Sequence, residues 1–328
     1  MKRLGVIGTM VWDRIHARDI RAAPVDEWGG IAYALAAASA AAPGDWYIVP
    51  LLKVGADLAP RAGDFLRALH GVDSSGVREV AEPNNRVELR YVDRERRCER
   101  LTGGVPPWRF DELEPLLSEI DALYINFISG FELDLETAWR VRVAFQGPIY
   151  ADLHSLFMGV GAGGLRFPQP LDGWREWLRC FDIVQVNDEE LALLAGAWGD
   201  PWRFAAETVG PELRLLLVTL GERGSAYVAS SAFGADPLGW HRRGLAVRPR
   251  IAAPGAARTQ KVPLRLGELV DGDPTGCGDV WGATAFLALL GGTDLNTAML
   301  EANSAAALNA RHRGATGLDQ HLRGRIHT

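Results

Sequence analysis

Apolar runs of strand length recur along the second half of the chain, and helical stretches separate them. The apolar runs span 122–127, 149–153, 183–186 and 215–220, and the helical patterns include 133–144 and 189–195. Strands that are apolar throughout and alternate with helices are typical of a parallel sheet that is covered on both faces. The pattern therefore predicts an α/β fold built on such a sheet.

The first half of the chain begins with strand patterns and then changes to a period of two. Apolar residues at 4–8 and 48–55 predict two strands, and a loop that carries Asp13 follows the first of them. Between 86 and 101, apolar residues alternate with charged ones, which predicts a hairpin with its turn at 93–96 and one apolar face. Because two strands cannot bury such a face alone, we expect the hairpin to cover the ligand site or a partner subunit.

The composition indicates one large domain. The chain has 328 residues, 48% of them hydrophobic, and no linker divides it, so we expect a single α/β domain over 1–328. The three cysteines include no CxxC pair, and the histidines form no cluster at metal spacing. Neither a disulfide framework nor a structural zinc site is supported.

Charge and hydropathy argue against nucleic acid and membrane as partners. The formal net charge is −6 and is spread without blocks, so the electrostatic footprint of a nucleic-acid or anionic-membrane binder is missing from the sequence. No run approaches the ~18 apolar residues of a membrane span. The apolar stretch after Lys2 and Arg3 is interrupted at 12–14, which is unlike a signal peptide. We expect a soluble cytoplasmic protein.

One stretch, 273–279, leads from a polar approach into the apolar run 280–290 and predicts a loop that feeds a helix. Gly276 and Gly278 lack Cβ, so a ligand can come close to the backbone N–H groups. The first N–H groups of a helix lack intrahelical partners and lie at the positive end of its dipole, which favours anion binding. Asp279 is then either the general base of a phosphoryl transfer or a cap of the helix. These residues alone leave both interpretations open.

Two features nearer the N-terminus also have two interpretations each. Asp13, just after the first strand, is placed to hold hydroxyl groups of a ligand, or it pairs with Arg14 on the surface. Gly29 and Gly30 open the alanine-rich helix 31–41, where they either position a ligand or let the helix pack closely on the sheet.

The stretch 159–164 spells G-x-G-x-x-G, the pattern of dinucleotide-binding loops. That pattern needs a strand before it and a helix that opens within it. Pro168 and Pro170 follow here and would interrupt such a helix. We therefore expect a mobile loop, and a nicotinamide-dependent dehydrogenase is disfavoured.

In their order along the chain, these segments resemble the ribokinase-like PfkB family of carbohydrate and nucleoside kinases, over nearly the whole length. The most specific match is 273–279 to the family signature D-x-T-G-A-G-D, with Cys277 where alanine is usual. Gly29 and Gly30 resemble the family's di-glycine motif. The further matches are 54–57 and 71–73 to the segments after it, 187–190 to N-x-x-E, and 219–224 to the nucleotide loop T-x-G-x-x-G.

The resemblance implies a ribokinase-like fold with a doubly wound, mostly parallel sheet, helices on both faces, and a small β lid from insertions near 12–28 and 84–105. It implies that Asp279 is the catalytic base. The N–H groups of Gly276, Cys277 and Gly278 would form the anion hole for the γ-phosphoryl group of ATP. The residues expected to hold or border the nucleotide are Asn187, Glu190, Thr219, Gly221, Gly224 and Asn303. Glu190, with Asn187, would hold Mg²⁺ through water, and a monovalent cation can also take part.

The resemblance also places the phosphate acceptor, which Asp13, Gly29 and Gly30 would hold. Two departures distinguish this pocket from that of a standard ribokinase. Ala34 stands where many members have a sugar-contacting asparagine, and His154 stands where some have the asparagine of an Asp-x-Asn segment.

Simpler interpretations stay open for several of these residues. Asn187 and Glu190 also fit a capping box at a helix start, and 219–221 also fits an ordinary turn at a strand end. Three aromatic residues near strand ends are either walls of the acceptor pocket or core residues, namely Trp12, Tyr33 and Phe127.

The sequence therefore predicts an ATP-dependent, Mg²⁺-requiring kinase that phosphorylates a hydroxyl of a sugar or sugar-like small molecule. A nucleoside kinase is the alternative within the same class. A catalytically silent, sugar-binding regulatory protein is the alternative outside it. We expect a monomer or a homodimer.

Overall fold

The computed structural model describes residues 1–16, 23–91, 97–234, 236–240, 257–269 and 272–326. Within them, an eight-stranded sheet has the strand order β16-β15-β14-β13-β10-β9-β1-β4. Neighbouring strands from β4 to β14 run parallel, whereas β15 is antiparallel to both β14 and β16. The strands are β1 (Lys2–Ile7), β4 (Trp46–Leu51), β9 (Ala122–Asn126), β10 (Ile149–Asp152), β13 (Ile183–Asn187), β14 (Leu215–Thr219), β15 (Ser225–Ala229) and β16 (Arg258–Val262).

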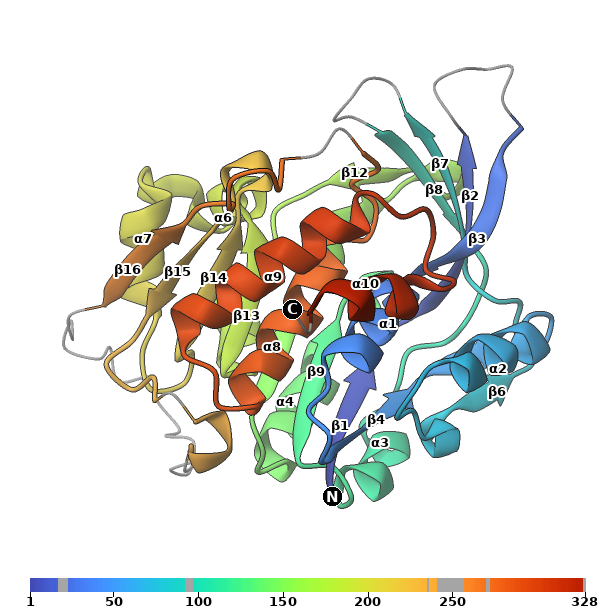
Figure 1. Ribbon diagram of the computed structural model, residues 1–328, viewed down its shortest axis with the longest axis horizontal. Coiled ribbons are helices and arrows are strands. Elements are labelled where there is room, and N and C mark those ends of the chain that lie inside the picture. The colour runs from blue at the N-terminus through green and yellow to red at the C-terminus, as the bar shows by residue number, and fades with distance from the viewer. Residues whose placement is uncertain (17–22, 92–96, 235, 241–256, 270–271, 327–328) are drawn as a thin grey trace.

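Helices cover both faces of this sheet (Figure 1), and each face has its own apolar core. Successive side chains of a strand point to opposite faces, so Leu4 and Val6 belong to one core and Ile7 to the other. The first core includes α1 (Ile31–Ala41), α8 (Cys277–Leu290), α9 (Leu295–Asn309) and α10 (Leu318–Ile326). The second includes α3 (Phe110–Leu117), α4 (Leu135–Ala144), α5 (Trp174–Arg179), α6 (Asp188–Ala195) and α7 (Pro201–Thr208). The predicted sheet, mostly parallel and covered on both faces, is confirmed.

The predicted strand at 48–55 is in fact two strands. β4 ends at Leu51, and β5 (Lys53–Gly55) pairs with β6 (Arg78–Val80) beside α2 (Ala59–Ala68). Pro50 is tolerated in β4 because β4 is an edge strand of the main sheet, which is where proline is found in sheets.

A second sheet of four strands lies at the upper right of Figure 1. Its strands, in the order β3-β2-β7-β8, are β3 (Val25–Gly30), β2 (Met10–His16), β7 (Arg86–Tyr91) and β8 (Arg97–Thr102). The predicted hairpin is confirmed as the antiparallel pair of β7 and β8, with Leu89 and Leu101 buried. Its expected turn at 93–96 lies outside the described residues. The role of this small sheet as a lid stays a prediction.

Asp13 lies in β2 and not in a loop, which corrects the prediction. Only Gly8 and Thr9 separate β1 from β2, and the chain then pairs with β3 and β7. The local sequence 10–16 is mixed in polarity because alternate residues of β2 are buried and partly exposed, whereas a central strand of the main sheet such as β9 is buried on both faces.

The stretch 159–164 belongs to a hairpin and is not the free loop that we expected. β11 (Met158–Val160) and β12 (Arg166–Pro168) pair in antiparallel fashion, and a bridge joins the hairpin to β8. The turn between them contains only a short 3-10 helix, Ala162–Gly164. No long helix opens within the G-x-G-x-x-G pattern, so the interpretation that it is no dinucleotide fingerprint is confirmed.

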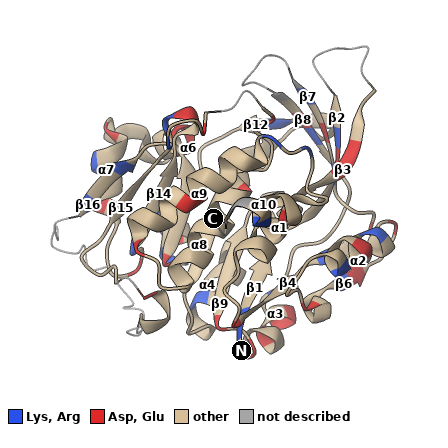
Figure 2. Cartoon of the chain, in the orientation of Figure 1, with Lys and Arg blue, Asp and Glu red and all other residues tan. Residues whose placement is uncertain are grey.

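Basic and acidic side chains are interspersed over the described residues (Figure 2). α9, with 15 residues, is the longest helix in the described ranges. None of the helices there combines the length and hydropathy that a membrane span needs.

Candidate active site

The stretch 273–279 folds, as predicted, into a turn that feeds a helix. α8 begins after Gly276, whose φ of 77° lies in the left-handed region that favours glycine. A Cβ on Gly276 would also overlap the ring of Tyr33 on α1. Glycine is therefore required here both by the turn and by the packing of α1 against it.

The N–H groups at the start of α8 differ in their availability. Cys277 N donates to Pro274 O at 3.1 Å, so this member of the predicted anion hole is already bonded within the turn. Gly278 is exposed and lies in the first turn, where N–H groups lack an intrahelical acceptor. A Cβ on Gly278 would meet only Gln185 Nε2, at 3.7 Å, so packing does not require glycine there. The absent side chain leaves the space that an approaching anion needs.

Asp279 lies in the first turn of α8 and is not its N-cap residue. The N-cap residue is Gly276. The Asp279 carboxylate instead accepts a hydrogen bond from Asn126 Nδ2 at 2.8 Å. The interpretation of Asp279 as the N-cap residue is therefore wrong, and its role as a base stays a prediction.

Three buried polar side chains lie in one row across the main sheet, beside the start of α8. Asn126, Asp152 and Gln185 are register partners on the neighbouring strands β9, β10 and β13. Gln185 Nε2 donates to Asp152 Oδ2 at 2.8 Å and to Gly278 O at 3.1 Å. The row therefore connects the sheet to the loop and to Asp279. Our sequence reasoning missed Asn126 and Gln185, although each is visible as a polar residue inside an apolar strand.

Two stacked tyrosines lie next to this row. The rings of Tyr124 and Tyr150 are 5.1 Å apart. The Tyr150 hydroxyl donates to Gln185 Oε1 at 2.5 Å, and the Tyr124 hydroxyl donates to the backbone oxygen of Asp279 at 3.4 Å. A Cβ on Gly282 would overlap Gln185 Oε1, so this glycine lets α8 lie against the tyrosines. Burial raises the pKa of both tyrosines well above the ordinary value, which keeps their hydroxyls protonated as donors.

The ionisable groups near the row perturb one another. Burial raises the pKa of Asp152 to about 8, and the negative charges of Glu190 and Asp279 act in the same direction. For His154, burial lowers the pKa, but the Glu190 carboxylate outweighs this effect and raises the pKa to about 9. His154 Nδ1 lies 2.6 Å from Glu190 Oε1. The carboxylates of Asp152, Glu190 and Asp279 thus share one electrostatic environment.

Asn187 and Glu190 form a capping box at the start of α6. Asn187 Oδ1 accepts from Glu190 N, and Glu190 Oε2 accepts from Asn187 N, both at 2.8 Å. The capping interpretation of this motif is confirmed. Within the described ranges, no three His, Cys, Asp or Glu side chains are grouped so that they could hold a metal ion. Contact of Glu190 with Mg²⁺ through water stays a prediction. Such a contact needs no cluster of protein ligands, because Mg²⁺ can be held by the phosphates of a nucleotide and by water together with one carboxylate.

The stretch 219–224 is the turn between β14 and β15. Thr219 ends β14 beside Asn187 of β13. Gly221 has a φ of 57°, and a Cβ there would have no atom within 4 Å. Gly224 has a φ of 86°, and its Cβ would overlap Val262 O. The strand-end turn is confirmed, and the open surface at Gly221 leaves room for the predicted nucleotide.

Asn303 is buried, and its side chain is engaged in packing. Its Oδ1 accepts from Trp281 Nε1 at 2.8 Å and from Ser225 Oγ at 3.0 Å. Its Nδ2 donates to Val262 O at 3.1 Å. Asn303 therefore ties α9 to α8, β15 and β16, and a direct contact of its side chain with adenine stays a prediction.

The predicted acceptor residues lie where the small sheet meets α1. Asp13 is buried, and a Cβ on Gly29 would overlap its carboxylate. Gly30 has a φ of 59° and is the N-cap of α1. Close packing thus accounts for both glycines. Next to Asp13, the half-buried Trp12 meets Trp28 edge to face at 5.0 Å.

Tyr33 connects the acceptor side to the loop. Burial raises its pKa well above the ordinary value, and the carboxylates of Asp13, Asp273 and Asp279 raise it further. Tyr33 therefore lies within the electrostatic reach of carboxylates from both the small sheet and the loop. Phe127, in contrast, is fully buried in the core on the other face of the sheet, so its interpretation as a pocket wall is wrong.

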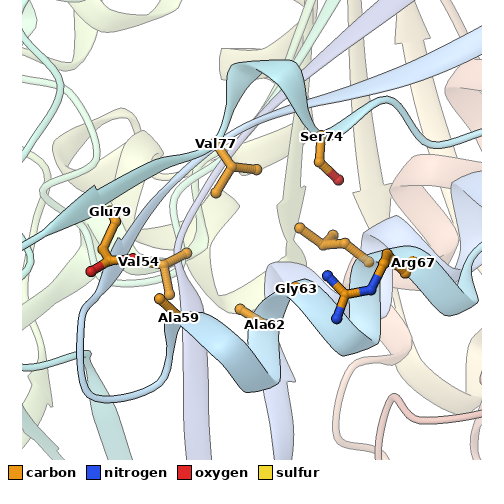
Figure 3. Close-up of a pocket in the computed structure, with 9 residues that line it drawn as sticks. Val54, Ala59, Ala62, Gly63, Arg67, Ser74, Val77 and Glu79 are labelled. Atoms are coloured by element: carbon orange, nitrogen blue, oxygen red, sulfur yellow. The ribbon is translucent and has the colours of Figure 1, made fainter.

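A separate pocket of about 280 Å³ lies between α2 and the strands β5 and β6 (Figure 3). Its wall includes the apolar side chains of Val54, Ala62 and Val77 and the charged side chains of Arg67 and Glu79. The predicted site residues contribute nothing to this wall, and we assign it no role.

Comparison with protein-family models and with curated proteins finds no match. Solved structures do match. A ribokinase from Thermotoga maritima is 16% identical, covers 100% of both chains and has a TM-score of 0.71. An Arabidopsis thaliana ribokinase complexed with ribose and ATP is 18% identical, with 100% of both chains covered and a TM-score of 0.69. A Burkholderia thailandensis nucleoside kinase complexed with inosine is 20% identical, with 99% of this chain and 96% of that chain covered and a TM-score of 0.65.

The chain has the ribokinase fold. In this ribokinase fold, Asn126 and Asp152 end β9 and β10, and Gln185 lies near the end of β13. Open α/β sheets bind their ligands beyond the carboxyl ends of parallel strands. The row and the start of α8 therefore lie where the fold places a ligand site.

Proposed function

We propose that the protein is a kinase that transfers the γ-phosphoryl group of ATP to a hydroxyl of a sugar or sugar-like small molecule. The observation that carries the proposal is the position of Asp279. Its carboxylate lies in the first turn of α8, accepts a hydrogen bond from Asn126, and follows the exposed backbone of Gly278. A base and anion-binding N–H groups on one helical turn are what phosphoryl transfer to an alcohol needs.

In the proposed reaction, Asp279 accepts the proton of the acceptor hydroxyl as the hydroxyl oxygen attacks the γ-phosphorus. The bond from that phosphorus to the bridging oxygen breaks, and ADP leaves with the electron pair. The N–H groups of Gly276 and Gly278 and the positive end of α8 stabilise the charge on the transferred group. Cys277 contributes by closing the turn with Pro274.

The nucleotide would lie along the turn 219–224 and the start of α8. Gly221 offers an open backbone surface there, and Asn303 holds the surrounding elements in place. Glu190 is the carboxylate that would hold Mg²⁺ through water, beside Asp152. Bound Mg²⁺ would neutralise part of the negative charge of the phosphates. ATP as the donor is also supported by the Arabidopsis ribokinase, whose structure contains it.

Asp13 would hold hydroxyl groups of the acceptor next to Gly29 and Gly30, and the small sheet would cover them. Ribose and inosine, which the similar structures contain, both present ribose hydroxyls. A nucleoside is the second candidate acceptor, because the Burkholderia thailandensis nucleoside kinase that matches this chain was solved in complex with inosine.

An ADP-release screen with the full chain, ATP and Mg²⁺ tests the proposal over sugars, sugar acids, polyols and nucleosides. We expect ADP above the acceptor-free rate with one class of acceptor, together with a phosphorylated product detected by mass spectrometry. Turnover of nucleosides alone would select the second candidate. Folded protein that binds ATP but forms no product with any acceptor would contradict a kinase and favour a silent regulatory protein.

A further inference from the structure

Asn126 occupies a position where the rest of its strand is apolar or aromatic. The other residues of β9 are Ala122, Leu123, Tyr124 and Ile125, and all five are buried. Asn126 itself has no exposed surface. Burying an amide costs free energy unless both its donor and its acceptor are bonded. An asparagine at this position therefore needs a physical reason.

Only the donor half of the Asn126 amide is well bonded. Its Nδ2 donates to Asp279 Oδ1 at 2.8 Å and lies 3.5 Å from the Tyr124 hydroxyl. Its Oδ1 is buried and has no hydrogen-bond partner in the described part of the chain. Turning the amide over would bring Oδ1 against the carboxylate, where two acceptors repel each other. The chain thus leaves an acceptor unbonded while an N–H group is directed at Asp279.

The neighbouring strands contribute a second contact to the start of α8. Asp152 is the register partner of Asn126, and Gln185 is the register partner of Asp152. Gln185 also donates to the backbone oxygen of Gly278. The row therefore fixes two consecutive residues of α8, Gly278 through its backbone and Asp279 through its carboxylate.

We propose that Asn126 is a positioning residue for Asp279, and that its N–H group helps to set the orientation in which the carboxylate meets the acceptor hydroxyl. The inference rests on the proposed kinase function. Asn126 acts through Asp279 and touches neither acceptor nor phosphate. A misplacement of about 1 Å at a reacting group can cost about 100-fold in rate, so loss of the hydrogen bond between Asn126 and Asp279 should be measurable in turnover. A hydrogen bond donated to a carboxylate also favours its ionised form.

Other titratable groups face Asp279 from the elements packed around the start of α8. They are Tyr33 on α1, Tyr124 on β9, Asp152 on β10 and Cys277 at the start of α8. All of them are retained when Asn126 is replaced. A change in pH dependence that follows the replacement therefore reports on the contact between Asn126 and Asp279.

The test compares Asn126→Ala and Asn126→Asp with wild type in the pH profile of kcat. Asn126→Ala should lower kcat by about 100-fold with KM changed less than about threefold. Asn126→Asp places two carboxylates side by side, and like charges raise the pKa of such a pair. The acid limb of the pH profile of kcat, where turnover falls as the base is protonated, should therefore move to higher pH by about one unit or more in Asn126→Asp.

Asn309→Ala is the matched control. Asn309 is also buried, also has an unbonded Oδ1, and also reaches the loop, but its Nδ2 donates to Thr275 O at 2.8 Å and not to Asp279. Loss of this amide should lower stability and leave the acid limb at its wild-type pH. Equal movement of the limb in Asn309→Ala and in the Asn126 variants would overturn the proposal.

The failure of this inference differs from the failure of the proposed function. An active wild type whose acid limb and kcat are unchanged by both Asn126 variants overturns the inference and leaves the kinase standing. If wild type phosphorylates no acceptor, the kinase fails. In that case, the contact between Asn126 and Asp279 is tested by following the ¹³C resonance of the Asp279 carboxyl in a pH titration. This resonance is assigned as the one that is missing from the spectrum of Asp279→Asn. A titration that moves upward in Asn126→Asp supports the contact, and one that does not move overturns it.

Discussion

Replacing Gly276 by alanine tests how closely the loop 273–279 fits against Tyr33. Two costs add. An alanine at a φ of 77° is less favourable by about 1–2 kcal/mol than in the right-handed region. Its Cβ would overlap the Tyr33 ring, and the shift that relieves such overpacking typically costs about 1–3 kcal/mol. Gly276→Ala should therefore lower the free energy of unfolding by about 2–5 kcal/mol.

Gly292→Ala is the matched control for this experiment. Gly292 follows α8 with a φ of 85°, and a Cβ there would have no atom within 4 Å. Only the conformational cost of about 1–2 kcal/mol applies to it. Urea unfolding of both variants measures the difference. Gly276→Ala should also cost less in a Tyr33→Ala background than in wild type. Equal destabilisation by Gly276→Ala and Gly292→Ala would refute the close fit.

The remaining predictions concern the cysteines. Cys277 Sγ makes weak hydrogen bonds with Ala306 O at 3.3 Å and Asn309 Nδ2 at 3.4 Å, so Cys277→Ala should lower stability by about 1 kcal/mol and leave turnover within about twofold. A far larger loss of turnover would show that the thiol takes part. Iodoacetamide at pH about 8 should label the exposed Cys98 and spare the other two, as intact and peptide mass spectra will show. Burial raises the pKa of Cys180 to about 12 and of Cys277 to about 11, so little of either is present as the reactive thiolate. Labelling of the half-buried Cys277 as fast as that of Cys98 would contradict the raised pKa of Cys277.

The main sheet could be predicted because its strands are buried on both faces. A run such as 122–127 has few polar positions, and the alternation of such runs with helices indicates that the strands run parallel. The break between β4 and β5 could not be predicted in the same way. Leu51, Leu52 and Lys53 are all buried, and only their pairing partners change. Pairing depends on distant segments, so the local pattern does not encode it.

The site residues differ in the same way: local features could be predicted from the sequence, and contacts between distant segments could not. Gly276 and Gly278 could be predicted because backbone sterics and the unpaired N–H groups of a helix start are local properties. Asn126 was missed because its partner, Asp279, lies 153 positions further along the chain. Asn303 was predicted at the nucleotide, whereas its observed contacts join four elements of the core, which only the folded arrangement reveals.

The most direct test of the central claim, that Asp279 is the catalytic base, is to measure turnover and ATP binding of Asp279→Asn in parallel. Asparagine keeps the shape of the side chain but cannot accept the proton of the acceptor hydroxyl. With the acceptor identified in the ADP-release screen, kcat should fall by about 100- to 10,000-fold, while the Kd for ATP measured by calorimetry stays within about threefold of wild type. Turnover within about tenfold of wild type, from a variant whose mass confirms the substitution, would contradict the claim.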